Sequence, residues 1–269
     1  MPELPEMETY RRLLHEQICG AVITSTAVQR EKTINLPPAQ FGQLLQNNRL
    51  TLIERRGKHL LFHLQSGHVL LLHLMLGGFL YLGTAEDKLA RTAQVTVFLG
   101  ERVLYFHGLR LGYLHLLTPD QIDEKLAPLG PEPLNPEFTL THFEKLLEEK
   151  RGVLKTAMVD QHWIAGIGNC YSDEICFHAR ILPTRRIPEL TAPERATLYH
   201  SMQEVLAEAI RFGGYMEQPL YRTDELTGGF DERCQVYDRG GEPCLRCGRP
   251  IVKDELSSRK VFFCTHCQQ

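Results

Sequence analysis

Four cysteines near the C-terminal end constrain this chain more than any other feature. They form two C-x-x-C pairs, Cys244 with Cys247 and Cys264 with Cys267, and sixteen residues separate the pairs. Four thiolates at this spacing match the tetrahedral sites that proteins build for Zn2+, with enough chain between them for a small β-hairpin. The alternative, four unrelated thiols, leaves the paired spacing unexplained. The pattern therefore predicts a zinc finger that holds one Zn2+.

The predicted role of this metal is structural. A site closed by four thiolates has no open coordination position for a substrate. It would stabilise the hairpin and present Arg259 and Lys260 to a partner. The remaining cysteines are scattered, which favours a metal in a reducing compartment over a disulfide framework; they are Cys19, Cys170, Cys176 and Cys234.

Length and charge limit the remaining possibilities. The chain has 269 residues, 43% of them hydrophobic, which is enough for two domains with buried cores. Its formal net charge of −3 argues against a strongly basic nucleic-acid binder, so any DNA-binding surface must be local. No apolar run approaches the roughly 20 residues that span a bilayer, and the N-terminus does not resemble a signal peptide. We therefore expect a soluble cytoplasmic protein.

The first part of the chain predicts a helix followed by an antiparallel β-sandwich. Pro2 and Pro5 precede a helical repeat of apolar residues, and Gly20 is placed to end it. Short β-rich runs separated by glycine-bearing turns follow, over residues 21–28, 59–64, 68–74, 94–99 and 102–107.

The second part predicts a helical domain and the finger. Residues 126–136 carry four prolines and are interpreted as a linker. Helical patterns follow over 139–149, 153–159, 169–178 and 192–212. The predicted fold is α+β, with an antiparallel sandwich domain over 1–125, the linker over 126–136, a helical domain over 137–232 and the zinc finger over 233–269.

Three further motifs are weak when taken one at a time. The turn Gly166-Ile-Gly-Asn169 precedes a helix, whose free N–H groups can receive a phosphate, but such a turn is more often only a tight connection. Lys58 lies in a basic turn beside an apolar strand. Glu3 and Glu6 fall in the first helical turn, where they can simply interact with the helix dipole.

Together these residues resemble a known family, the formamidopyrimidine-DNA glycosylases and endonuclease VIII. The resemblance rests on four motifs in order along the chain: Pro2-Glu-Leu-Pro-Glu6, Arg56-Gly-Lys58, Asp160-Gln161 with Gly166 to Glu174, and the terminal four-cysteine finger. The N-terminal motif favours the formamidopyrimidine branch. The resemblance implies a helix-two-turns-helix fold for the second domain and a bifunctional DNA glycosylase and AP lyase.

The resemblance also implies a nucleophile. Pro2 becomes the N-terminus once Met1 is removed, and an α-amine has a pKa of about 8, far below that of lysine. Attack of a secondary amine on the sugar C1′ gives an iminium without an N–H proton to lose, which acts as an electron sink for strand cleavage. Glu3 would handle the proton at the deoxyribose ring oxygen, and Glu6 would support the same site.

Phosphate contacts are implied in the same way. Lys58 would hold the flanking phosphate and assist elimination. Asn169 and Arg259 would grip the phosphates around the flipped nucleotide, and Arg259 is the candidate for the second elimination. Further DNA contacts would come from Arg110, Arg151, Lys155 and Lys260.

The sequence departs from the family pattern where the family fills the gap left by the flipped base with Met, Arg and Phe. Leu76, Leu109 and Leu111 occupy these three void-filling positions in the favoured alignment, and a shift by one residue would place Met75 at the first. Leucine cannot hydrogen-bond an orphaned base and has no flat face to insert between bases. Two interpretations stay open: the substrate preference is altered, or leucine simply replaces the larger side chain and specificity is unchanged.

Three functions therefore compete. The first is a base-excision-repair glycosylase and lyase. The second is a paralogue specific for bulky alkylated or crosslinked bases, and the third is a non-catalytic protein that binds damaged DNA. In each case the expected partner is damaged DNA, the expected state is a monomer without a small-molecule cofactor or membrane contact, and the expected place is the bacterial nucleoid.

Overall fold

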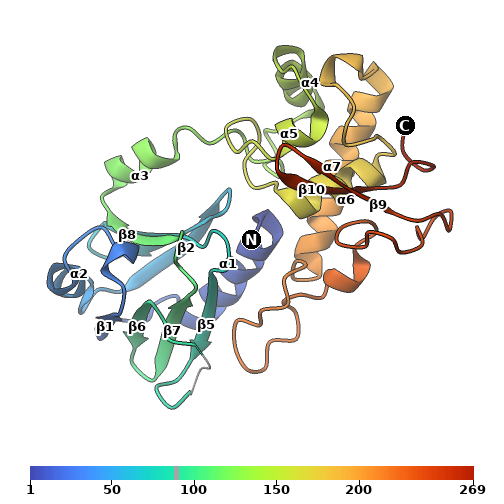
Figure 1. Ribbon diagram of the computed structural model, residues 1–269. Coiled ribbons are helices and arrows are strands. Elements are labelled where there is room, and N and C mark those ends of the chain that lie inside the picture. Colours follow the sequence, from blue (N-terminus) through green and yellow to red (C-terminus); the bar gives the residue numbers. More distant parts are fainter. Residues whose placement is uncertain (88–90) are drawn as a thin grey trace. The chain divides into compact units, whose positions relative to one another are not determined.

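The computed structural model describes residues 1–87 and 91–269 and divides them into two compact units (Figure 1). Unit 1 comprises Met1–Pro128 together with Met216–Gly229, and unit 2 comprises Leu129–Tyr215 together with Phe230–Gln269. The predicted boundaries differ at three places: the units divide between Pro128 and Leu129, inside the predicted linker; the predicted finger is part of unit 2; and Met216–Gly229 is part of unit 1. The segment Met216–Gly229 was assigned to the helical domain, but it packs with unit 1, where the backbone N–H of Leu82 donates to the carbonyl of Leu220.

The described residues of unit 1 form two four-stranded antiparallel sheets and four helical segments. One sheet has the order β1-β6-β7-β5, formed by Ser25–Val28, Val95–Leu99, Arg102–His107 and Phe79–Gly83. The other has the order β2-β3-β4-β8, formed by Leu50–Arg56, His59–Leu64, Val69–His73 and Tyr113–Leu117. The helices are α1 (Leu4–Ile18), the short η1 (Glu31–Thr33), α2 (Pro38–Leu45) and α3 (Pro119–Leu126).

The core of unit 1 lies between the two sheets. Alternate residues of both sheets enter one hydrophobic cluster, to which the apolar face of α1 also contributes; Phe62, Leu72, Val97, Phe106 and Leu14 are examples. Helix α1 packs against β2 and β3. The sheet therefore supports the start of the helix, where the predicted nucleophile lies.

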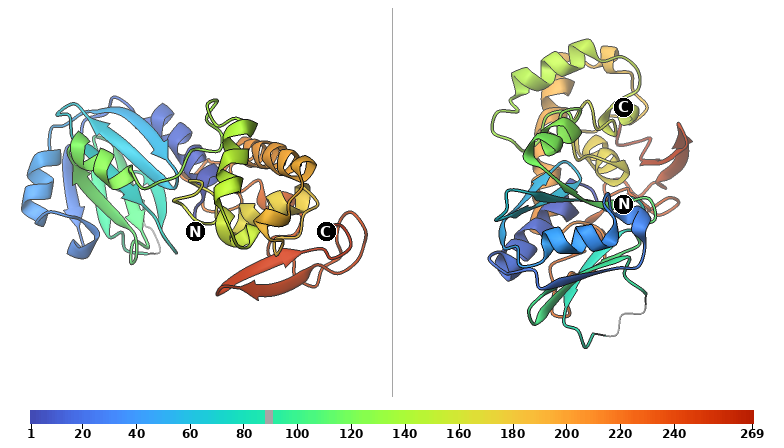
Figure 2. Two further views of the ribbon diagram at one scale, coloured as in Figure 1. Left: turned by 90° about the horizontal axis from the view of Figure 1, so that it is seen from above. Right: turned by 90° about the vertical axis from the view of Figure 1, so that its left-hand side faces the viewer.

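Unit 2 is helical, with a β-hairpin at its C-terminal end. Its helices are α4 (Leu140–Glu149), α5 (Leu154–Met158), α6 (Asn169–His178), η2 (Ile187–Glu189), α7 (Ala192–Arg211) and η3 (Asp231–Arg233). Nearly every residue of α6 is buried, as expected for a helix surrounded by other elements. The hairpin consists of β9 (Val252–Leu256) and β10 (Arg259–Phe263), and Figure 2 shows it projecting from the helices of this unit.

The predicted fold class is confirmed. The strands expected in five places correspond to β1, β3, β4, β6 and β7, and the expected helices correspond to α1, α4, α5, α6 and α7. Sequence patterns missed β2, β5, β8, α2 and α3. Among the described residues, none of the helices combines the length and the apolar character needed to cross a membrane.

Candidate active site and nucleic-acid interface

The N-terminus of α1 carries two buried carboxylates beside Pro2. Glu3 is the residue that precedes the helix, and its backbone N–H donates to Glu6 Oε2 over 2.7 Å. Glu3 is 2% exposed and Glu6 is fully buried. Because the first N–H groups of a helix favour negative charge, this position suits a carboxylate. Removal of Met1 would place a secondary amine next to both acids.

Lys58 lies in the turn that joins β2 to β3. Arg56 pairs with His59, so Gly57 and Lys58 form the two-residue connection. The lysine is only 5% exposed. The positive charge of Lys58 acts on His73 in β4. Burial is the larger cause and the charge of Lys58 the second cause that lower the pKa of His73 to about 4. Unit 1 therefore contains Pro2, both glutamates and Lys58.

The two predicted void-filling loops contact each other through glycines. A Cβ at Gly108 would lie 1.8 Å from the carbonyl oxygen of Gly77, so only glycine fits there. Leu76 and Leu111 are 63% and 62% exposed. Leu109 is different: it is fully buried in the core of unit 1.

In this structure Leu109 does not present its side chain at the loop surface, and its assignment to a void-filling position stays a prediction. Gly108 has a φ of 68°, and the chain that follows it directs the Leu109 side chain into the sandwich. An apolar side chain is favoured there by its burial. Leu76 and Leu111 present exposed apolar side chains at the two loops, and Met75, the alternative residue at the first, is partly buried.

A pocket of about 460 Å3 opens beside the first of these loops. Gly77 and the stacked rings of Phe79 and His107 line this pocket. The centroids of the two rings lie 4.7 Å apart. Gln218 from the Met216–Gly229 segment forms another wall. The Tyr10 hydroxyl donates to the Gln218 carbonyl over 3.0 Å, so α1 supports this wall directly.

The glycine turn in unit 2 ends at the first residue of α6. Gly166 has a φ of 96°, which a glycine adopts without strain. The Gln161 side chain holds the turn, because it accepts from the Gly166 N–H over 2.9 Å and donates to the Ile167 carbonyl over 2.7 Å. The Asn169 amide nitrogen donates to the Lys260 carbonyl over 3.0 Å. The turn is therefore attached to the finger hairpin.

Lys155 does not lie on the surface, and this burial does not favour its predicted role as a DNA contact. It is 1% exposed, and its Nζ donates to Asp173 Oδ1 over 2.7 Å and to the Asn169 carbonyl over 2.8 Å. Asp173 belongs to α6, whose apolar surroundings make an unpaired ammonium group costly. Lys155 is therefore committed to protein partners.

The predicted cationic residues other than Lys58 and Lys155 lie at the surface. Arg259 and Lys260 are exposed at the start of β10, after a turn in which Ser257 and Ser258 both have positive φ. This is the turn geometry that matches the twist of a hairpin. Arg110 is also exposed, and Arg151 is exposed with its guanidinium donating to the Glu148 carbonyl near the end of α4.

The four cysteines of the finger converge as predicted. Their Sγ atoms all lie within 4.8 Å of one another; Cys244 and Cys267 are 3.9 Å apart, and Cys247 and Cys264 are 3.5 Å apart. A tetrahedral Zn2+ with Zn–S bonds of about 2.3 Å requires sulfur atoms about 3.8 Å apart. The donor set and its geometry therefore fit one structural Zn2+.

Comparison with known proteins agrees with this geometry. Residues 1–113 match the formamidopyrimidine-DNA glycosylase N-terminal domain, residues 129–218 match the formamidopyrimidine-DNA glycosylase H2TH domain, and residues 241–269 match the zinc finger found in FPG and IleRS. The chain belongs to the formamidopyrimidine-DNA glycosylase family. Members of this family are base-excision-repair DNA glycosylases, and AP lyase activity is part of the family.

Relatives of this family member match it over its full length. The formamidopyrimidine-DNA glycosylase of Thermus thermophilus is 38% identical over 276 residues, which cover 100% of this chain and 98% of the relative. That of Listeria innocua is 33% identical over 273 residues, covering 100% of both.

Solved structures of the family also superpose on this chain. The Lactococcus lactis Fpg in complex with DNA containing an abasic site gives a TM-score of 0.92 at 31% identity, with 99% of each chain covered. The MutM (Fpg) protein of Thermus thermophilus gives 0.87 at 36% identity, covering 99% of this chain and 98% of the other.

Sequence reasoning assigned no role to two buried acids of this family member. Asp173 and Glu174 were noticed only as part of the motif, although acids in a buried helix are an unusual feature. Burial raises the pKa of Asp173 to about 7, while Lys155 opposes the rise. Burial also raises the pKa of Glu174, which accepts three backbone N–H groups from Gln235, Val236 and Tyr237. Such acids indicate a polar network inside the protein.

Proposed function

We propose that this chain removes a damaged base from DNA by attack of the Pro2 amine on the sugar C1′ and then cleaves the strand by elimination. The observation that carries the proposal is the pair of buried carboxylates, Glu3 and Glu6, held together beside Pro2 at the start of α1. A protein that only binds DNA needs neither a free secondary amine nor two desolvated acids. This argues against the non-catalytic alternative.

The proposed steps use side chains of unit 1. The Pro2 nitrogen forms a bond to C1′ while the bond from C1′ to the damaged base breaks. The base leaves with that electron pair and takes up the proton that the Pro2 nitrogen gives up. Glu3 delivers a proton to the ring oxygen as the sugar ring opens to the iminium, and Glu6 holds the backbone of Glu3. Loss of a proton from C2′ then expels the 3′ phosphate, with the iminium as electron sink.

Phosphate binding is proposed for cations of both units and for the glycine turn. Lys58 would hold the phosphate beside the reacting sugar, because an anion stabilises an ammonium group that is largely shielded from water. Arg259 and Lys260 would bind phosphates from the exposed hairpin, together with the backbone N–H groups at Asn169. Arg110 and Arg151 are candidates for further phosphate contacts.

The exposed leucines favour a substrate preference that differs from the family pattern. Leu76 and Leu111 can fill the space left by a flipped base, but they offer no polar group to the opposite base. We propose that discrimination of the opposite base is poor and that lesions which already disrupt the helix, such as bulky alkylated or crosslinked bases, are better substrates. The apolar pocket beside Gly77 and Phe79 is large enough for a ring system, within the usual range for ligand pockets.

Borohydride trapping on a duplex with an abasic site tests the chemistry. The protein from which Met1 has been removed should give a covalent complex, and the same protein with Met1 retained should give none. No trapped species from the fully processed protein would refute the Pro2 mechanism. Binding of an abasic analogue in a band-shift assay without cleavage would support the non-catalytic alternative.

A panel of lesion duplexes tests the substrate. Excision is measured for 8-oxoguanine opposite cytosine, for 8-oxoguanine opposite adenine and for a bulky or crosslinked base. We expect weak excision of 8-oxoguanine, little difference between the two opposite bases, and faster removal of the bulky lesion. Efficient removal opposite cytosine with strong rejection opposite adenine would restore the ordinary family substrate.

We also propose that the enzyme works at the bacterial nucleoid, in keeping with its bacterial relatives.

A further inference from the structure

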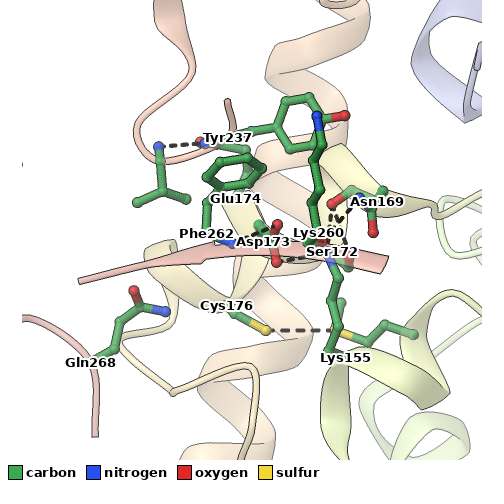
Figure 3. Close-up of polar contacts among 12 residues, drawn as sticks. Lys155, Asn169, Ser172, Asp173, Glu174, Cys176, Tyr237, Lys260, Phe262 and Gln268 are labelled. Carbon is green, nitrogen blue, oxygen red and sulfur yellow. Dashed lines mark hydrogen bonds and ion pairs between the residues drawn. The ribbon is translucent and has the colours of Figure 1, made fainter. Parts of the chain in front are cut away.

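The finger hairpin and the phosphate-binding turn meet at a buried polar network in unit 2. Figure 3 shows Lys155, Asn169 and Asp173 pointing toward one another, with the backbone of Lys260 and Phe262 alongside. Asp173 uses both carboxylate oxygens: Oδ1 accepts from Lys155 Nζ over 2.7 Å, and Oδ2 accepts from the Phe262 backbone N–H over 3.1 Å. One carboxylate therefore connects α5 to β10.

A second connection runs in parallel to the first. Lys155 also donates to the Asn169 carbonyl, and the Asn169 side chain donates to the Lys260 carbonyl. Phe262 and Lys260 are alternate residues of β10, immediately after Arg259. The register of this strand relative to the start of α6 is thus fixed at two points, by Asp173 and by Asn169, and Lys155 holds both of these residues.

Glu174, which follows Asp173 in α6, fixes the chain that leads into the finger. Glu174 is buried, and its carboxylate accepts the N–H groups of three consecutive residues, Gln235 to Tyr237. Two neighbouring acids of one helix thus hold the start of the finger segment and its hairpin strand β10.

Stability alone does not account for the ion pair. Lys155 is 1% exposed and Asp173 is fully buried, and replacing a buried ion pair by apolar groups of similar volume is often neutral or stabilising. What apolar groups cannot supply is a directional link to particular backbone atoms. The contacts made by this pair lead to Asn169 and to the strand that carries Arg259 and Lys260.

We propose that Lys155 and Asp173 are positioning residues that hold the finger hairpin in register with the glycine turn, so that Asn169, Arg259 and Lys260 bind neighbouring phosphates together. The inference rests on the proposed function, because it takes these three residues as phosphate ligands. Neither Lys155 nor Asp173 touches DNA. Their effect is on how many phosphates the protein binds at once.

The test removes the ion pair and its link to β10 with the double variant Lys155→Met and Asp173→Leu. Methionine approximates the length of lysine and leucine the shape of aspartate, so no lone buried charge remains and the side chain at position 173 no longer accepts from the Phe262 N–H. The matched control is Arg185→Met with Glu194→Gln, which removes an ion pair of 3.2 Å in the same unit that makes no contact with the hairpin. Both proteins are checked for one bound zinc per chain.

The measurement is the dissociation constant for a duplex with a tetrahydrofuran abasic analogue at several salt concentrations. Each phosphate contact contributes about −0.9 to the slope of log K against log salt. Loss of the Arg259 and Lys260 contacts should make the slope shallower by about 1.8, so the affinity ratio between 50 and 200 mM salt falls by about tenfold. The control should keep the wild-type slope.

A merely structural role would lower the fraction of active protein without changing the slope. An unchanged slope in the double variant, whether or not affinity falls, would overturn the proposal. Borohydride trapping at saturating DNA separates this result from the proposed function. Trapping by the double variant would show that Pro2 still reacts, whereas absence of trapping in the wild type would refute the Pro2 mechanism and leave the salt-slope result standing by itself.

Discussion

Acid should destabilise unit 1 through two stacked histidines. His59 on β3 and His73 on β4 are paired across the sheet, with ring centroids 4.3 Å apart. Burial, and then the neighbouring His73, lowers the pKa of His59 to about 3, and burial, and then Lys58, lowers that of His73 to about 4. Lys125 acts in the same direction on both. The folded protein therefore keeps both rings neutral well below pH 6.

The sign and size of the effect follow from linkage. An unfolded histidine has a pKa near 6.5, so below that pH the unfolded state binds more protons than the folded state, and stability falls as the pH falls. A pH of 5 lies about 1.5 units below the pKa of an unfolded histidine. At about 1.4 kcal/mol per unit, each of the two histidines removes about 2 kcal/mol of stability between pH 7 and pH 5.

The variant His73→Phe isolates one of these contributions. The Nδ1 atom of His73 has no hydrogen-bond partner among the described residues, so phenylalanine can replace the ring without losing a contact at that atom. Urea denaturation at pH 7 and pH 5, with hydrogen exchange of β3 and β4 peptides, reports on unit 1. The variant should lose about 2 kcal/mol less than the wild type on acidification, and the exposed-site control His200→Phe should behave as the wild type does. An equal loss in His73→Phe and wild type would refute the reasoning.

Three further results are expected. Cys264→Ser should lose zinc and DNA binding while the remainder stays folded, because so short a hairpin has little core of its own; metal analysis and band shifts check this, and wild-type affinity without metal would contradict it. Pro2→Gly should weaken base excision, and Glu3→Gln should bind DNA but excise more slowly than wild type, in single-turnover assays; a wild-type rate for Glu3→Gln would show that the proton transfer was misassigned. Leu109→Ala should cost about 2–5 kcal/mol in urea denaturation and Leu111→Ala less than about 0.5, because only the former is in the core; equal losses would contradict the burial argument.

Local patterns in the sequence predicted the elements whose signals are local. The zinc site followed from the spacing of four cysteines, and α1 from its helical repeat and flanking prolines. Helix α3 was missed although Thr118 and Gln121 form a capping box at its start, a signal that the sequence carries. Strand β2 was missed because its exposed Leu52 and the irregular pairing after Leu50 break the alternation that identifies a strand.

The sequence predicted those parts of the site whose residues are neighbours in the chain, but not the contacts that only the fold creates. Pro2 and Glu3 are neighbours in the chain, so their proximity needed no structure. Lys155 and Asp173 are eighteen residues apart, and the cationic side chain alone did not reveal that it is directed inward. The direction of Leu109 likewise depends on the approach of two loops that are distant in the chain.

Restoring the family arginine at position 109 should therefore fail to restore reading of the opposite base. The Leu109 side chain lies in the core because Gly108 packs against Gly77, and this contact tolerates no Cβ. Leu109→Arg would place an unpaired cation among apolar side chains, at a cost on the order of 3 kcal/mol or more. Excision of 8-oxoguanine opposite cytosine and adenine, measured with urea denaturation of the same protein, tests this. We expect a destabilised enzyme with unchanged opposite-base preference. A stable Leu109→Arg protein that newly rejects adenine would mean that this side chain can reach the DNA, and that the preference of the enzyme depends on residue 109 alone and not on the packing of the two loops.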